Sequence, residues 1–275
     1  MSFKVLLLDS VDPVCGEVFA ARGIQADQPG KLTEEELFEK IPEYDGMVVR
    51  SATTVTPELL EKATNLKVVG RAGVGVDNID IPSATAKGVL VMNTPDGNTI
   101  STAEHTCGMI IALSRNIPQA VAKVKEGGWD RKKFMGTEVH GKTLGIVGLG
   151  KIGSEVAKRM LAFGMEIQAY DPFATKEHAG EMGVKLVELD ELLGSSDYLS
   201  VHTPLTEKTK GLVSKKSADK IKKGIRLVNC ARGGIYEEAD LPELLESGVV
   251  GAIALDVYSS EPPTEELYQV LADPR

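Results

Sequence analysis

Residues 144–153 read Leu144-Gly145-Ile146-Val147-Gly148-Leu149-Gly150-Lys151-Ile152-Gly153, and they set the architecture of the chain. The first four are typical of a buried strand, and a helical pattern over 154–163 follows the last glycine. A second apolar segment over 166–170 ends at Asp171. A G-x-G-x-x-G turn between a strand and a helix, with an acid after the next strand, is the fingerprint of a dinucleotide-binding βαβ unit. We therefore predict a dinucleotide site at this turn.

Each residue of the turn has a physical task. Gly148 allows the tight turn, Gly150 lets the backbone approach the pyrophosphate, and Gly153 lets the helix pack closely against the strand. Lys151 and Ile152 contribute backbone at the helix start, where free N–H groups and the positive end of the helix dipole favour phosphate. A turn that only packs the sheet is the alternative, and the flanking strand, helix and acid argue against it.

Asp171 indicates which dinucleotide binds. Its carboxylate is placed to accept hydrogen bonds from a ribose 2′-hydroxyl, and it would repel a 2′-phosphate. NAD is therefore predicted in preference to NADP.

Short apolar segments alternate with amphipathic ones along most of the chain. Such alternation predicts right-handed βαβ units and a parallel sheet. It is interrupted by turn residues at 94–98 and by two helical stretches at 101–114 and 118–126, so we predict two doubly wound α/β domains with a boundary near residue 95. Before that boundary, strands are expected at 4–9, 47–51, 66–72 and 89–93, and helices at 13–22, 33–40, 56–63 and 81–87, with Thr33 and Thr56 as helix caps.

Composition excludes several classes of function. The chain has 275 residues and a formal net charge of -9 without a long basic run, which argues against nucleic acid as a partner. Cys15, Cys107 and Cys230 lie far apart and form no C-x-x-C pair, so we expect neither a disulfide framework nor a metal site, and a reducing cytoplasm fits best. No apolar segment has the length of a membrane span.

Five further motifs accompany the glycine turn. They read Gly70-Arg71-Ala72-Gly73-Val74-Gly75-Val76-Asp77-Asn78, Asn93-Thr94-Pro95, Val201-His202-Thr203-Pro204, Asn229-Cys230-Ala231-Arg232-Gly233-Gly234 and Ala254-Leu255-Asp256-Val257-Tyr258. In this order the series resembles the D-2-hydroxyacid dehydrogenases over the whole chain. The resemblance implies a flavodoxin-like substrate domain over 1–95, without its closing carboxyl-terminal segment, and a Rossmann NAD-binding domain over 96–275.

The resemblance also assigns cofactor contacts outside the glycine turn. Thr203, Cys230 and Ala231 are expected to line the cofactor, Asp256 to contact its nicotinamide side, and Val74 to approach it through backbone. Taken alone, Cys230 is more typical of a packed thiol than of a nucleophile.

Substrate chemistry requires a cation beside the carboxylate. Arg232 follows a buried segment over 225–229, at the end of the strand where α/β sheets bind ligands. A planar, bidentate guanidinium suits a carboxylate, and the resemblance gives Arg232 that task. It further implies that Glu261 hydrogen-bonds the catalytic histidine and raises its pKa. A surface salt bridge and an ordinary loop acid are the respective alternatives.

The first domain is expected to contribute Arg50 and Arg71 at strand ends, and Gly73 in a turn with free backbone N–H groups. Structural arginines are the alternative. Segments 49–53 and 129–136 resemble those family members that oxidise 3-phospho-D-glycerate to 3-phosphohydroxypyruvate, the entry to serine biosynthesis. Arg131 and Lys132 would then reach the substrate phosphate across a homodimer or higher homo-oligomer, whereas a solvated charge run is the alternative.

The family's general acid/base is a histidine in a Pro-His-Leu-Gly-Ala-like segment, and the chain ends before such a segment. His105, His140, His178 and His202 each look structural, with His202 nearest the expected cofactor. We therefore expect NAD binding with slow turnover. Two other functions stay open: reduction or oxidation of another D-2-hydroxyacid such as glyoxylate, hydroxypyruvate, glycerate or D-lactate, and an NAD-sensing, corepressor-like binding protein.

Overall fold

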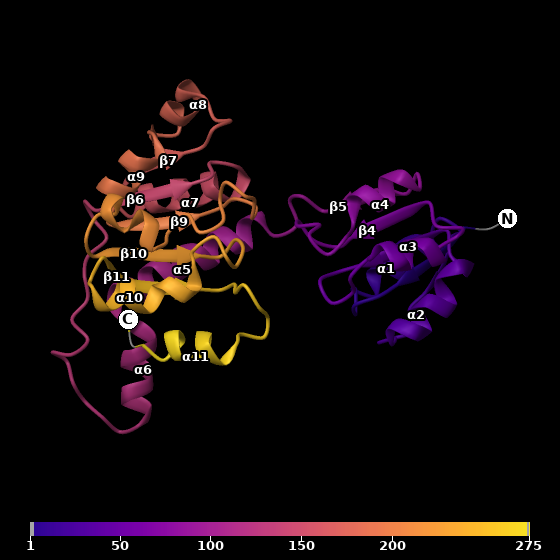
Figure 1. The fold of residues 1–275 in the computed structure, drawn as a ribbon, viewed down its shortest axis with the longest axis horizontal. Helices are drawn as coiled ribbons and strands as arrows, with labels where there is room; N and C mark the ends of the chain where they lie inside the picture. Colours follow the sequence, from indigo (N-terminus) through magenta and orange to yellow (C-terminus); the bar gives the residue numbers. More distant parts are fainter. Residues whose placement is uncertain (1–2, 274) are drawn as a thin grey trace. The chain divides into compact units, whose positions relative to one another are not determined.

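In residues 3–273 and 275, which the structure describes, two parallel β-sheets form the centre of the fold. This computed structural model divides into two compact units, Met1–Asn98 and Thr99–Arg275, and Figure 1 shows helices flanking a sheet in each. Every strand pairing within the two sheets is parallel. The predicted fold class of two doubly wound α/β domains is confirmed.

The first sheet has the strand order β2-β1-β3-β4-β5, which is the flavodoxin-like order. Its strands are β1 (Lys4–Leu7), β2 (Gln25–Asp27), β3 (Gly46–Val49), β4 (Val68–Arg71) and β5 (Leu90–Asn93). Strand β2 was not predicted, because Gln25-Ala26-Asp27 is short, mostly polar and at the sheet edge, and it carries no run of apolar residues.

Helices cover both faces of the first sheet. They are α1 (Val14–Ala20), α2 (Glu34–Lys40), α3 (Pro57–Lys62) and α4 (Ile81–Ala86), with a 3-10 turn η1 at Ile41–Glu43. Leu37, Leu59 and Ala84 of α2, α3 and α4 pack in one core with Met47 of β3. Phe19 of α1 packs on the opposite face. As predicted, Thr33 caps α2 in a capping box and Thr56 caps α3.

The second sheet has the order β11-β10-β9-β6-β7-β8. Its strands are β6 (Thr143–Val147), β7 (Glu166–Tyr170), β8 (Lys185–Leu186), β9 (Tyr198–Val201), β10 (Ile225–Asn229) and β11 (Val250–Leu255). Counted from β6, this is the 3-2-1-4-5-6 order of dinucleotide-binding sheets, in which the chain reverses its direction of winding between β6 and β9. Ligands bind at that switch point in open α/β sheets.

Two helical layers enclose the second sheet (Figure 1). The helices are α5 (Thr99–Arg115), α6 (Ile117–Lys125), α7 (Lys151–Ala162), α8 (Lys176–Glu181), α9 (Leu189–Ser195), α10 (Leu241–Glu246) and α11 (Glu265–Leu271), with 3-10 turns η2 (Lys215–Lys220) and η3 (Glu238–Asp240). Ile110 of α5 and Val156 of α7 share one core with Ile146 of β6. Leu192 of α9 and Leu244 of α10 lie in the core of the other face.

Helix α7 begins three residues earlier than predicted. The sequence pattern predicted a helix from Ser154, but α7 begins at Lys151. Gly153 therefore lies in the first turn of the helix, where its missing side chain lets the helix approach the glycine turn closely. Among the described residues, no helix combines the length and hydrophobicity needed to cross a membrane.

Candidate functional site

Five predicted cofactor residues lie at one edge of the second sheet. Gly148 follows β6, Asp171 follows β7, Thr203 lies just beyond β9, Cys230 follows β10 and Asp256 follows β11. The last residues of these strands are in register with one another, because Val147 pairs with Tyr170 and Val201, and Asn229 pairs with Val201 and Leu255. The sheet itself thus brings residues from five separate segments to a common edge.

The glycine turn has little room for side chains. Gly148 has a φ of 93°, and a Cβ there would come within 2.7 Å of the His202 carbonyl oxygen. A Cβ on Gly153 would lie 2.0 Å from the Gly148 carbonyl oxygen. A Cβ on Gly150, by contrast, would meet no described atom within 4 Å. The turn is therefore closed toward the protein and open beside Gly150.

The start of α7 faces this open side. Gly150 is its N-cap, and no described side chain caps the helix there. Lys151 and Ile152 occupy the first turn, whose backbone N–H groups have no partner within the helix by geometry. A helix that begins in this way is suited to an anion such as a phosphate.

Asp171 is bonded to the glycine turn. One carboxylate oxygen accepts a hydrogen bond from the Leu149 N–H at 2.8 Å, and the other accepts from the Phe173 N–H at 2.8 Å. Asp171 thus stabilises the glycine turn, in addition to its predicted role as the ribose contact. A carboxylate has about four lone-pair sites, so the ribose role is compatible with both bonds.

The loops after β10 and β11 pack directly against each other. Asn229 is buried, and its side chain accepts from the Ala231 N–H and donates to the Arg232 carbonyl, so it shapes the turn that carries Arg232. A Cβ on Gly233 would lie within 2.2 Å of the backbone of Tyr258 and Ser259. This contact requires glycine, and it brings the arginine loop against the loop that ends in Glu261.

Glu238 ties these two loops together, and the sequence analysis did not single it out. Its buried carboxylate accepts from the Ser259 N–H at 2.8 Å, the Ser259 hydroxyl at 2.6 Å and the Gly234 N–H at 3.2 Å. Ser259 lies in the Glu261 loop and Gly234 in the Arg232 loop. A buried acid in the segment after the Ala-Arg-Gly-Gly turn was the available signal, but burial is not visible in one sequence.

Cys230 and Thr203 differ in how their polar atoms are satisfied. The buried thiol of Cys230 lies 3.4 Å from the Met109 sulfur, and burial raises the pKa of Cys230 to about 11. It is therefore protonated at neutral pH, as expected for a packed thiol. The hydroxyl oxygen of Thr203 is buried and has no hydrogen-bond partner among the described residues. A buried hydroxyl without a partner is costly, so it indicates a ligand that completes it.

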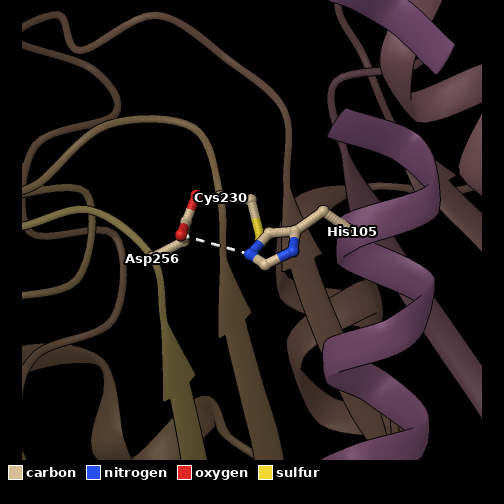
Figure 2. A group of neighbouring side chains, drawn as sticks. All are labelled: His105, Cys230 and Asp256. Atoms are coloured by element: carbon tan, nitrogen blue, oxygen red, sulfur yellow. Dashed lines mark ion pairs between the residues drawn. The ribbon is translucent and has the colours of Figure 1, made fainter. Parts of the chain in front are cut away.

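Asp256 has a histidine partner, His105, that was expected to be structural. Its carboxylate lies 3.1 Å from Nε2 of His105, which projects from α5, and Cys230 lies beside the pair (Figure 2). His202 had been expected to be the histidine nearest the cofactor. Its ring is instead enclosed and 2.9 Å from the Ser200 hydroxyl, and burial lowers the pKa of His202 to about 4. The long helix α5 brings His105 to the sheet edge, which the sequence spacing did not reveal.

Glu261 and the four histidines are not paired. The Glu261 carboxylate is exposed and accepts from the Tyr258 N–H at 3.4 Å. Among the described residues, none of the four histidines forms an ion pair or hydrogen bond with Glu261. The expected glutamate–histidine pair is therefore not formed by the histidines of this chain.

The first unit has its own cluster of predicted residues at the carboxyl ends of β3 and β4. Arg50 follows β3, and its N–H donates to the Asp9 carboxylate at 2.7 Å. Arg71 ends β4, and its guanidinium occupies the space where a Cβ of Gly73 would lie. The Gly73 N–H donates to the Arg71 carbonyl at 2.8 Å. The prediction that this N–H is free was wrong, because the backbone turns back on itself directly after β4.

Other predicted residues have simple surroundings. Val74 is half-buried, and its carbonyl accepts from the Asn93 side chain at 2.7 Å. Ala231 is half-buried in the turn after β10. Arg131 and Lys132 are exposed in the turn that follows α6.

The family model of the D-isomer specific 2-hydroxyacid dehydrogenase NAD-binding domain matches residues 107–274. This chain belongs to that family. Among curated relatives, this chain is 52% identical to D-3-phosphoglycerate dehydrogenase of Rattus norvegicus over 262 residues, which is 95% of this chain and 49% of the relative. It is 58% identical to the Bacillus subtilis enzyme of the same name over 222 residues, 81% of this chain and 42% of the relative. The chain thus spans about half the length of these relatives.

Solved structures agree with this membership. A glyoxylate reductase from Paecilomyes thermophila superposes with a TM-score of 0.89 at 30% identity, covering 99% of this chain and 86% of that one. D-lactate dehydrogenase from Aquifex aeolicus, complexed with NAD and lactic acid, gives 0.85 at 28% identity, covering 97% and 84%. The resemblance seen in the motifs is confirmed at the level of the family and the fold.

The described residues of this chain fit the NAD that its family domain binds. Three observations support the fit: the open space beside Gly150, the uncapped start of α7 and the unpartnered hydroxyl of Thr203. The Asp171 carboxylate lies at the turn and can accept further hydrogen bonds beside the two that it already accepts. The space beside Gly150 and the start of α7 match the pyrophosphate, and Asp171 matches the ribose. The Thr203 hydroxyl matches a polar edge of the dinucleotide.

Proposed function

We propose that this dehydrogenase catalyses the NAD-dependent oxidation of 3-phospho-D-glycerate to 3-phosphohydroxypyruvate, the entry to serine biosynthesis. Two lines of support single out this member of the class: the curated relatives at 50–58% identity carry that enzyme's name, and the exposed Arg131 and Lys132 provide positive charge for a phosphate. The solved structures at 28–30% identity are named for unphosphorylated acids, glyoxylate and D-lactate, which supports the class of reaction but not the phosphorylated substrate.

One observation carries the proposal: the Arg232 and Glu261 loops pack together beside the predicted cofactor residues. Bound NAD supplies the hydride acceptor at this edge. Arg232 would hold the substrate carboxylate through two parallel N–H···O bonds, which fixes C2 toward the cofactor. Gly148, Gly150, Gly153, Lys151 and Ile152 would hold the pyrophosphate and Asp171 the ribose, with Asp256, Thr203, Cys230, Ala231 and Val74 lining the remainder.

The proton from the substrate hydroxyl needs a separate acceptor. Glu261 would orient a histidine and favour its protonated form. Since none of the four described histidines pairs with Glu261, we propose that none of them is this base. Loss of general acid/base help costs typically about 100- to 10,000-fold in rate, so the chain itself should turn over slowly.

Arg50, Arg71 and Gly73 are proposed to serve the substrate from the first unit. Arg50 is exposed at a strand end, and its loop is fixed by the Asp9 carboxylate through the N–H groups of Arg50 and Thr53. A backbone fixed in this way lowers the entropic cost of positioning a side chain for an anionic ligand. The anion would contact the side chains, because the Gly73 N–H is already bonded.

A substrate panel tests the function. NADH oxidation at high protein concentration is followed with 3-phosphohydroxypyruvate, hydroxypyruvate, glyoxylate and pyruvate, for the chain itself and for Arg232→Ala. The phosphorylated acid should give the highest kcat/KM, and Arg232→Ala should lower it at least 100-fold. Lys176→Ala, which removes an exposed charge on α8, is the control and should leave kcat/KM unchanged. Preference for glyoxylate or pyruvate would instead support the second candidate, another D-2-hydroxyacid.

We also propose that the enzyme is a homodimer or higher homo-oligomer in the cytoplasm. The α6 helix presents Ile117, Val121 and Val124 to solvent at helical spacing, and Trp129 beyond it is 80% exposed. An exposed apolar stripe of this kind marks a protein interface. Sedimentation of Val121→Glu beside the unchanged chain tests this: a shift to monomer supports it, and a monomeric unchanged chain contradicts it.

A further inference from the structure

Three side chains of different chemistry converge at the edge of the second sheet. His105 projects from α5, Cys230 directly follows β10 and Asp256 directly follows β11. Their ligand atoms, an imidazole nitrogen, the Sγ and a carboxylate oxygen, all lie within 4.8 Å of one another. Figure 2 shows the Asp256 carboxylate facing the imidazole ring of His105, with the Cys230 side chain next to them. Such a cluster was not predicted, because the three residues are far apart in sequence and form no metal-binding spacing.

The set matches the ligands of a thiolate-preferring divalent cation. Zn²⁺ takes cysteine sulfur at about 2.3 Å, histidine nitrogen at about 2.0 Å and carboxylate oxygen at about 2.0–2.2 Å, which places tetrahedral ligands roughly 3.3–3.5 Å apart. His105 and Asp256 already lie 3.1 Å apart. A change of roughly 1 Å in the position of the Cys230 sulfur or of the imidazole would complete the geometry.

The cluster is open on one side and closed on the other. The side chains of His105 and Asp256 are 54% and 49% exposed, whereas Cys230 is 8% exposed. A cation can therefore reach the site from solvent, with the thiol at the floor of the site. Three protein ligands leave a fourth position for water, as in zinc sites that are not purely structural.

We propose that His105, Cys230 and Asp256 form a binding site for Zn²⁺ or a cation of similar preference, and that the bound cation excludes the nicotinamide end of NAD. The exclusion rests on the proposed function, which assigns Cys230 and Asp256 to the cofactor. The cation excludes the nicotinamide because both would use the same groups. When the Asp256 carboxylate and the Cys230 thiol bind a cation, they cannot also contact the nicotinamide. The cation is thus an inhibitor of cofactor binding.

Ligand chemistry gives the site its selectivity. Mg²⁺ and Ca²⁺ bind oxygen ligands, and a buried thiol and an imidazole offer them little. Zn²⁺ and Co²⁺ bind sulfur and nitrogen strongly enough to displace the thiol proton. Mg²⁺ and Ca²⁺ therefore serve as control ions.

Direct metal binding to the NAD-free chain is the first test. Titration with Co²⁺ should produce a thiolate-to-metal charge-transfer band that saturates at one ion per chain and is abolished by Zn²⁺, and excess Mg²⁺ should have no effect. His105→Gln and Cys230→Ser should each weaken Zn²⁺ binding at least tenfold. His178→Gln on α8 and Cys15→Ser in the first unit are matched controls and should bind as the unchanged chain does. No charge-transfer band, or one that survives Cys230→Ser, would overturn the site.

His105→Gln keeps the test independent of folding, because this side chain is half exposed and its replacement leaves the core intact. The second test is competition: NADH should raise the measured Kd for Zn²⁺ in proportion to its concentration. If the charge-transfer band forms but NADH does not change the Kd, the exclusion is wrong. If NADH fails to bind even without metal, measured by thermal shift, the cofactor assignment fails while the metal site stands on the first test.

Discussion

Glu238 holds Ser259 by two hydrogen bonds, one from the Ser259 N–H at 2.8 Å and one from its hydroxyl at 2.6 Å. The same carboxylate accepts from the Gly234 N–H at 3.2 Å. One buried side chain therefore connects the loop that carries Arg232 with the loop that carries Glu261. Glu238 acts as a positioning residue, since it reaches the proposed substrate groups only through the two loops.

Glu238→Ala should destabilise the second unit and loosen both loops. The three donors would lose a charged acceptor, and hydrogen bonds to charged groups contribute about 1.5–3 kcal/mol each. Removing the carboxylate also removes the cost of burying its charge, so we expect a net loss of about 3 kcal/mol in the free energy of unfolding. Urea denaturation measures this. Glu243→Ala removes an exposed partner of Lys215 and should cost less than about 1 kcal/mol. Equal effects of the two substitutions would contradict the bridging role.

Gly150 and Gly153 should separate binding from stability. Gly153→Ala places a Cβ 2.0 Å from the Gly148 carbonyl, and overpacking of this kind costs about 1–3 kcal/mol, so its melting temperature should fall. Gly150→Ala meets no described atom, so its stability should hold while its NADH affinity falls at least tenfold. Gly180→Ala on α8 is the control. Differential scanning fluorimetry with and without NADH reads both effects, and a Gly150→Ala protein that binds NADH normally would place the cofactor elsewhere.

Asp171 should set the choice of cofactor. In Asp171→Ala the repulsion of a 2′-phosphate and the ribose acceptor are both lost, so the ratio of the Kd for NADPH to that for NADH should fall at least tenfold. The ratio is used because Asp171 also braces Leu149, and damage to the turn weakens both dinucleotides alike. Asp190→Ala, an exposed acid on α9, is the comparison. An unchanged ratio would remove Asp171 from the ribose site.

His202 should make stability depend on pH on the acid side. Burial lowers the pKa of His202 to about 4, whereas a histidine in the unfolded chain titrates near about 6.5. As the pH falls below about 6.5, the unfolded state takes up the proton before the folded state does, so stability is lost between about pH 6.5 and pH 4. Above about pH 6.5 the full stability is present. From pH 7.5 to pH 5 this group should remove about 2 kcal/mol.

Urea denaturation at the two pH values checks this. His202→Asn should lose less stability on acidification than the unchanged chain does, by about that amount. His178→Asn, which replaces an exposed histidine on α8, should lose as much stability on acidification as the unchanged chain does. If all three proteins respond alike, the enclosed imidazole is not the cause.

Much of the fold could be predicted because its signals are local. The strands over 166–170 and 225–229 have the expected bounds, since runs of buried apolar residues define them. β2 was missed because its pattern is mostly polar and short. The start of α7 was placed too late, and Gly153 lies in its first turn, packed against Gly148.

The site was less predictable where it depends on contacts between distant segments. Motif order indicated which residues lie at strand ends, and the structure brings Asp171, Thr203, Cys230 and Asp256 to one edge. His105 and Glu238 could not be found in this way, because each acts through a partner far away in the sequence. The Gly73 N–H was misjudged because a turn hydrogen bond depends on backbone angles that residue types do not determine.

The central proposal is that residues 1–275 bind NAD and a phosphorylated D-2-hydroxyacid, and that none of their four histidines is the base that moves the proton. Its most direct test compares NADH oxidation by 3-phosphohydroxypyruvate for the 275-residue chain and for a version lengthened at its carboxyl end to carry a Pro-His-Leu-Gly-Ala segment. Both should bind NADH, and the lengthened version should turn over about 100- to 10,000-fold faster. Equal rates would contradict the claim, and would make His105, beside Asp256, the first residue to replace.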